Sequence, residues 1–173
     1  MKKVFLTLSV LSLFVLPAYA TKGLRENAQN AQDSNLRTER TVHRDGITKV
    51  KSTYNVSETA QRFESIAREK GLKIIAKVDH KAGAKSVNQQ LRPTQLIIFG
   101  NPAVGTPLMQ CNQTLAIDLP QKALIWEDQQ GQVWLGYNSP KYLSESHQIT
   151  GCGEQSLEKL NNTLTLLSQE VTQ

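Results

Sequence analysis

The chain has 173 residues and a mass of 19.3 kDa, which suits one domain better than two. Its residues are 39% hydrophobic, 20% charged and 6% aromatic, and its mean hydropathy is −0.39. This composition excludes a polytopic membrane protein, a collagen-like chain and a fully disordered one. The formal charge of +5 comes from scattered basic residues and not from a basic stripe, which argues against nucleic acid as a partner.

The first twenty residues have the three parts of a secretory signal. Lys2 and Lys3 precede an apolar run, and Ala18-Tyr19-Ala20 matches the small-x-small pattern that signal peptidase requires. The apolar run is shorter than the roughly 20 residues that span a bilayer. We therefore expect residues 1–20 to be a signal peptide cleaved after Ala20, export to a bacterial periplasm, and no membrane anchor afterwards.

Residues 21–45 are polar and lack apolar periodicity, which predicts a flexible leader ahead of a domain over residues 46–150. In that domain a strand is expected up to Tyr54. Asn55 and Glu58 form a capping-box pattern that predicts a helix ending at Gly71. A second strand is expected over residues 72–78, with its alternate apolar residues on one face, and a short helix over residues 82–91.

Residues 94–99 are almost entirely apolar beyond the first two positions, which predicts a central strand ended by Gly100-Asn101-Pro102. Thr106 and Pro107 then match the cap and first position of a helix that runs to about Ile117. Residues 123–126 and 133–137 predict a hairpin, followed by a short helix. Apolar residues at 3–4 spacing make residues 151–173 a C-terminal amphipathic helix. Together these elements predict an α+β fold with one mostly antiparallel sheet and helices packed on one face.

Two cysteines in one exported domain predict a disulfide between Cys111 and Cys152. Closing that loop would contribute about 2–4 kcal/mol. The alternative is a metal or redox site that combines these thiols with His80 or His147. However, the sequence has neither a CxxC pair nor paired ligands at zinc spacing. We therefore expect no metal and no cofactor.

Three patterns in the sequence resemble chemical sites. Residues 100–106 resemble a phosphate-binding loop but lack the lysine that nucleotide hydrolysis requires. Asp79 and His80 are adjacent at a strand end, where an acid and an imidazole can share acid–base work. Glu127 and Asp128 form a carboxylate pair at the expected hairpin tip, where such pairs are usually solvated.

The stretch from about Ile47 to Ile149 resembles the domain of unknown function family numbered 302. The resemblance rests on two specific runs, Arg92-Pro93-Thr94-Gln95 and Phe99-Gly100-Asn101-Pro102, and continues over segments 78–80, 105–109, 118–120, 122–128, 133–138 and 140–143, ending at His147. It implies a compact α+β domain that is able to pair as a homodimer and has no established reaction. Its polar residues gather at strand ends, so we hypothesise that they line one small-ligand pocket: Asp79, His80, Arg92, Asn101, Thr106, Lys122, Glu127 and Tyr137.

The leading prediction is thus an exported module without catalysis that binds a small ligand or a periplasmic protein. One alternative is a small acid–base enzyme that uses Asp79, His80 and Glu127. The other is a periplasmic metal or redox accessory protein built on the cysteines and histidines.

Overall fold

The computed structural model describes residues 41–42 and 46–173, so the expected signal peptide and most of the expected leader lie outside the described residues. Six strands form one sheet: β1 (Thr41–Val42), β2 (Ile47–Ser52), β3 (Lys73–Asp79), β4 (Thr94–Gly100), β5 (Gln121–Glu127) and β6 (Val133–Asn138). Within these described residues, five α-helices and one 3₁₀-helix connect or follow the strands: α2 (Val56–Glu69), α3 (His80–Ser86), α4 (Pro102–Cys111), η1 (Gln113–Ile117), α5 (Pro140–Ser146) and α6 (Glu154–Thr172).

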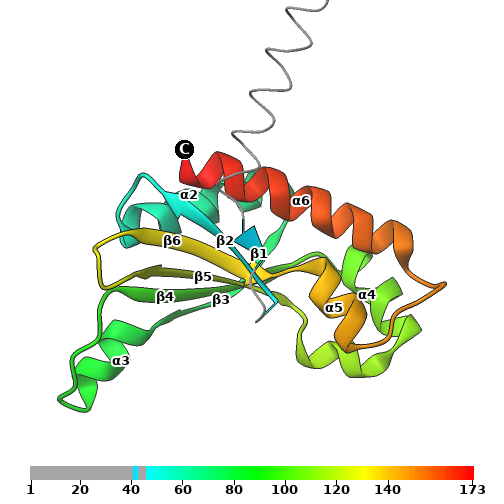
Figure 1. The fold of residues 1–173 in the computed structure, drawn as a ribbon, viewed down its shortest axis with the longest axis horizontal. Coiled ribbons are helices and arrows are strands. Elements are labelled where there is room, and N and C mark those ends of the chain that lie inside the picture. The colour runs from blue at the N-terminus through cyan, green and yellow to red at the C-terminus, as the bar shows by residue number, and fades with distance from the viewer. Residues whose placement is uncertain (1–40, 43–45) are drawn as a thin grey trace, which may run out of the picture. The chain divides into compact units, whose positions relative to one another are not determined.

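The sheet has the strand order β1-β2-β6-β5-β4-β3, and every neighbouring pair is antiparallel. Helices α2 and α6 lie side by side on one face of it (Figure 1). Helix α3 joins β3 to β4 at one end of the sheet, whereas α4 follows β4 at the opposite end (Figure 1). The α+β fold with an antiparallel sheet and a C-terminal helix is therefore confirmed.

Alternation along the strands builds the core against α2 and α6. Successive residues of a strand point to opposite faces of the sheet. The face toward α2 and α6 carries the fully buried side chains of Ile97, Ile125 and Leu135. Phe63 of α2 meets Phe99 of β4 edge to face, with ring centroids 4.9 Å apart. The apolar stripe of α6 packs on the same core through four buried side chains, those of Leu160, Leu164, Leu167 and Val171.

The helix cap predicted at Asn55 is present, and Glu58 contacts it through the Asn55 side chain in place of the backbone N–H of a capping box. The Glu58 backbone N–H donates to Asn55 Oδ1 at 2.9 Å, and Asn55 Nδ2 donates back to the Glu58 carboxylate at 3.1 Å. Gly71 has a φ of +73°, the left-handed conformation that ends a helix at little cost only for glycine. The local sequence therefore determines both ends of α2.

The predicted start of the helix that follows β4 was wrong. Helix α4 begins at Pro102, and Asn101 is its cap, because Asn101 Oδ1 accepts from the Ala103 N–H at 2.9 Å. Two cap–proline pairs occur five residues apart, and the earlier pair starts the helix. Thr106 is not a cap, and Pro107 stands inside the helix, where it lacks a backbone donor. The helix ends at Cys111 and not near Ile117, since residues 113–117 form the separate helix η1.

The alternate apolar residues of β3 do not share one face as predicted. A β-bulge lies between Ile74 and Ala76 and changes the phase of the strand. As a result Ile74 is opposite Phe99, on the core face, whereas Val78 is opposite Leu96, on the other face, and is 39% exposed.

The sheet face opposite α2 and α6 carries two stacked indoles. The rings of Trp126 and Trp134 are 6.5 Å apart at an interplanar angle of 22°. A Cβ atom at Gly136 would lie 2.9 Å from the Trp126 ring, so this ring lies across the backbone of Gly136. The structure also places Thr41–Val42, inside the segment expected to be a leader, as a strand paired with β2.

Candidate functional site

A pocket of about 430 Å³ lies beside α4, at the end of the sheet where β4 ends and β5 begins. This volume falls in the usual range for small-ligand sites. Its walls come from α4, from the loop before β5 and from one side chain of α6: Val104, Leu108, Met109, Leu119, Pro120 and Leu160. The lining is mostly apolar, so the pocket favours an apolar ligand body.

One buried amide in this pocket lacks a hydrogen-bond partner. Gln121, the first residue of β5, lines the pocket and is 3% exposed. Its Nε2 has no partner among the residues the structure describes. A buried polar group without a partner costs about 1–3 kcal/mol, so such groups are rare.

The other polar residues that line the pocket carry a single charge. Lys73, at the start of β3, is the one ionisable residue among those that line the pocket. Within the described chain, no acidic group pairs with it. Asn101 and Thr106 also line the pocket. The side-chain Oδ1 of Asn101 already accepts a hydrogen bond from the Ala103 N–H and caps α4. The pocket thus offers one cation and no carboxylate to a ligand.

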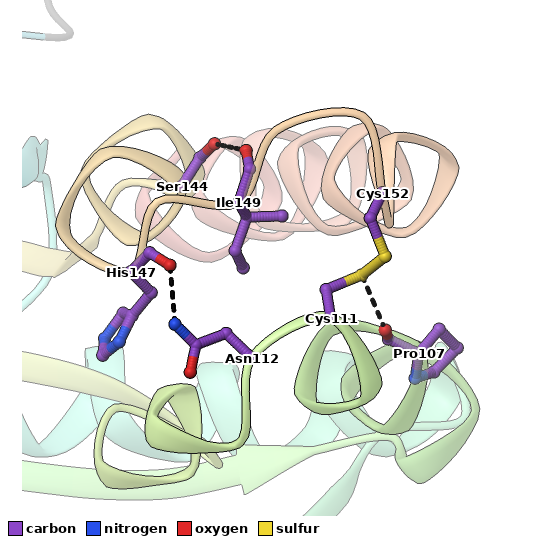
Figure 2. The surroundings of a disulfide bond; sticks show 7 residues. All are labelled: Pro107, Cys111, Asn112, Ser144, His147, Ile149 and Cys152. Carbon is purple, nitrogen blue, oxygen red and sulfur yellow. Dashed lines mark hydrogen bonds between the residues drawn. A yellow bond between two sulfur atoms is a disulfide. The ribbon is translucent and has the colours of Figure 1, made fainter.

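The two cysteines connect α4 to the segment that leads into α6, and both helices contribute residues to the pocket. Cys111 ends α4, Cys152 precedes α6, and their sulfur atoms lie at bonding distance with Cα atoms 5.9 Å apart (Figure 2). This Cα separation is typical of a disulfide. A Cβ atom on Gly153 would lie 3.0 Å from the Leu108 side chain and 3.2 Å from Cys111 Sγ, so the chain passes close to α4 here.

His147 caps the end of α5 and holds the neighbouring loop. Its Nε2 lies 2.7 Å from Asp118 Oδ2, and its Nδ1 lies 3.1 Å from Thr114 Oγ1. Its backbone oxygen accepts from Asn112 Nδ2 at 2.8 Å (Figure 2). Each of these contacts joins α5 to η1 or to the residues beside it, so His147 has a positioning role in the fold.

The eight residues predicted to share one pocket are distributed over several places. Asn101 and Thr106 line the pocket beside α4. Asp79 and Glu127 line a second pocket of about 320 Å³, which adjoins residues of β4 and α2. One carboxylate oxygen of Asp79 accepts from the Ala82 N–H at 2.9 Å and caps α3.

The other four predicted residues line neither pocket. His80 is the exposed first residue of α3. Arg92 donates from Nε to the Glu127 backbone oxygen at 3.1 Å. Lys122 donates to the Asp118 backbone oxygen at 3.1 Å, and Tyr137 is 6% exposed in the core.

Sequence reasoning missed Gln121 and Lys73. The signal for Gln121 was present, since it shares the period-2 phase of Ala123 and Ile125 and is therefore a polar residue at a core position. The hairpin was expected to begin at residue 123, which left Gln121 outside the strand. Lys73 had no signal, because its approach to the pocket depends on the pairing of Lys73 with Gly100.

The fold and the pocket define a single-sheet α+β domain with an apolar cavity at one end of the sheet. Residues 48–167 match the model of "Domain of unknown function DUF302", and the chain belongs to that family. The fold is similar to that of a crystal structure of an uncharacterized conserved DUF302 protein from Bacillus stearothermophilus, with a TM-score of 0.66 and 14% identity. The likeness covers 73% of this chain and 98% of that one.

The chain is also similar to part of three longer proteins from Brucella. It is 46% identical over 104 residues to the fluoride-specific ion channel FluC 1 of Brucella suis, which covers 60% of this chain and 41% of that protein. The same identity holds for FluC 1 of Brucella abortus and FluC 2 of Brucella melitensis, with 38% of each protein covered. The chain thus spans about two fifths of the length of these relatives. Across residues 41–42 and 46–173, no helix has the length and apolar character to cross a bilayer.

Proposed function

We propose that this chain is an exported module that binds a small, largely apolar molecule without transforming it. The observation that carries the proposal is the pocket of about 430 Å³ beside α4, whose lining is mostly apolar. A ligand that fills the cavity would remove apolar surface from water, both its own and that of the lining residues.

Export is part of the same proposal and rests on two features of the chain. The first is the secretory pattern of residues 1–20. The second is the pair of cysteines at bonding distance, which suits an oxidising compartment.

The two alternatives have less support. The acid–base enzyme needs His80 beside Asp79 and Glu127, and only the two carboxylates line a common pocket. The metal or redox protein needs several ligands at one point. In the described part of the chain, no three His, Cys, Asp or Glu side chains form a group that could hold an ion.

The proposal is tested with N-phenyl-1-naphthylamine, an uncharged apolar dye whose fluorescence rises in a dry site. We expect saturable binding of one dye per folded chain. Gly105 lies in α4 on the pocket wall, and a Cβ atom there would lie 3.6 Å from Leu119 Cδ1, an ordinary contact. Gly105→Leu should therefore fold, fill the cavity and abolish the dye signal.

The matched control is Gly83→Leu. Gly83 is also a helical glycine, and a Cβ atom there would meet nothing within 4 Å, but it lies in α3, away from the pocket. This variant should bind the dye like the unmodified chain. Equal binding by both leucine variants, or no saturable binding by the unmodified chain, would overturn the proposal.

A further inference from the structure

We infer that an arm formed by residues 80–92 binds the surface of bilayers that contain anionic phospholipid. The arm consists of helix α3 and the loop that returns the chain to β4, and it projects from one end of the sheet on the side away from α6 (Figure 1). This inference goes beyond the proposed function, because it concerns a different surface and needs no ligand in the pocket beside α4.

The arm adds no buried side chain to the core. All of its residues are exposed apart from the half-buried Ala84. Local hydrogen bonds give it its shape: Asp79 caps the helix, and the N–H groups of Val87 and Gln89 donate to the Ala84 oxygen at 3.1 Å and 2.9 Å. Packing against the domain therefore does not account for the side chains that the arm carries, and these side chains are free to meet a partner.

The charge of the arm is complementary to an anionic surface. Residues 80–92 contain Lys81, Lys85 and Arg92 and no acidic residue. The two lysines are four positions apart in α3, so they lie on the same face of the helix. Neither forms an ion pair with a residue that the structure describes. Asp79 precedes the arm at the sheet, where its carboxylate is occupied with the helix cap. Lysines near an anionic bilayer are attracted to its surface potential.

The apolar side chains of the arm favour a bilayer over an acidic protein surface. Val87 is 66% exposed and Leu91 is 43% exposed. Asp79 caps the end of α3 next to the sheet, so Val87, which caps the other end, lies at the far end of the helix. A bilayer accepts such side chains below its headgroups while neighbouring lysines stay with the phosphates, and it needs no matching groove.

The test is sedimentation of the protein with sucrose-loaded vesicles. One set contains equal parts of phosphatidylglycerol and phosphatidylcholine, and the other contains phosphatidylcholine alone. The protein is the secreted form, with its mass checked, because a retained apolar run at residues 4–16 would bind lipid by itself. We expect binding to the anionic vesicles and roughly tenfold weaker binding, or none, to the neutral ones. Equal binding to both sets would overturn the inference. Binding to neither would also overturn it and would leave an acidic protein as the partner of the arm.

A matched pair of lysine variants assigns the charge to the arm. Lys85→Gln should weaken binding to the anionic vesicles about fivefold. Lys159→Gln in α6 removes the same charge from another exposed lysine without an ion pair in the described chain, and it should bind like the unmodified protein. Equal weakening by the two variants would mean that net charge alone attracts the vesicles, and it would overturn the inference.

The apolar contact is tested by a loss and a gain. Val87→Ser should weaken vesicle binding about fivefold, whereas Leu166→Ser, at a 53% exposed residue of α6, should not change it. Gly83 lies one turn before Val87, and a Cβ atom there would meet nothing within 4 Å, so Gly83→Leu should fold and bind about fivefold more tightly. Circular dichroism checks that each variant is folded. Equal losses in the two serine variants, or no gain in a folded Gly83→Leu, would overturn insertion of the arm.

Discussion

Asp128 shows how a single side chain organises the turn between β5 and β6. Its Oδ2 accepts from the Trp134 indole N–H at 2.7 Å, and its Oδ1 accepts from the backbone N–H groups of Gln130 and Gln132 at 2.9 Å each. The bond from Trp134 is the largest cause that holds the pKa of this carboxyl below its usual value of 3.8. Partial burial opposes that shift, while the two backbone bonds and the charge of Arg92 assist it.

This lowered pKa predicts how the stability of the protein depends on pH. A carboxyl with a lower pKa in the folded state stabilises the protein above its unfolded pKa, and that contribution is lost as the pH falls through the folded pKa. Asp128→Asn should therefore be less stable at pH 7, and its stability should approach that of the unmodified chain as the pH falls below about 3.8. Melting temperatures measured from neutral to acid pH check this, and Glu127→Gln is the control. Parallel curves for Asp128→Asn and the unmodified chain would contradict it.

At the scale of the element, the C-terminal helix α6 is held by contacts that only the tertiary structure supplies. The last carbonyl groups of a helix have no partner within it. Arg62 of α2 donates to two of them, to the Val171 oxygen at 3.0 Å and to the Glu170 oxygen at 2.8 Å. Its guanidinium lies 4.2 Å from the centre of the Tyr54 ring, and the Thr53 N–H donates to the Thr172 oxygen at 3.1 Å.

Arg62→Ala should lower the free energy of unfolding by about 1–3 kcal/mol, because it removes two hydrogen bonds from a cation to helix carbonyls. Urea unfolding measures this loss, and amide exchange should show that the last turn of α6 opens first. The control is Arg68→Ala in the same helix, whose exposed pair with Glu64 contributes at most about 0.5 kcal/mol. Equal losses in the two variants would show that the contacts of Arg62 with α6 contribute nothing specific.

At the scale of the whole molecule, the cysteine pair joins the end of α4 to the segment just before α6, and both helices line the pocket. Leu108 of the pocket lies about one turn before Cys111 in α4. Leu160 of the pocket lies in α6, which begins shortly after Cys152. A covalent link here restricts the unfolded chain and also limits how far the pocket walls separate. We therefore expect this bond to affect both the stability of the protein and the ligand binding proposed for the pocket.

Reduction of the pair should cost about 2–4 kcal/mol of folding free energy and weaken binding of the apolar dye. Urea unfolding and dye titration, each with and without dithiothreitol, measure both effects. The double variant Cys111→Ser with Cys152→Ser should be insensitive to the reductant. Mass spectrometry of the native protein should show the loss of two hydrogens. An intact pair of thiols would refute this prediction.

The sequence by itself determined the elements whose signals are local. The helix cap at Asn55, the left-handed Gly71, the hairpin and the stripe of α6 each depend on residues a few positions apart, and the α+β class followed from their order. The specific runs around Arg92 and Phe99 carried the family resemblance. Where two local signals were equivalent, as for Asn101-Pro102 and Thr106-Pro107, the sequence could not choose the helix start.

Only the tertiary structure decided which residues share a site. Lys73 and Gln121 are far apart in the chain, and both line the pocket because β3 pairs with β4 and β4 pairs with β5. The same pairing places Asp79 and Glu127 at another pocket, away from Asn101 and Thr106. The residues at the strand ends were expected to converge on one pocket. Antiparallel neighbours finish at opposite ends of the sheet, so these polar residues form two separate groups. The physical reason is that capping and turns are local, whereas a pocket is formed by the register of strands distant in sequence.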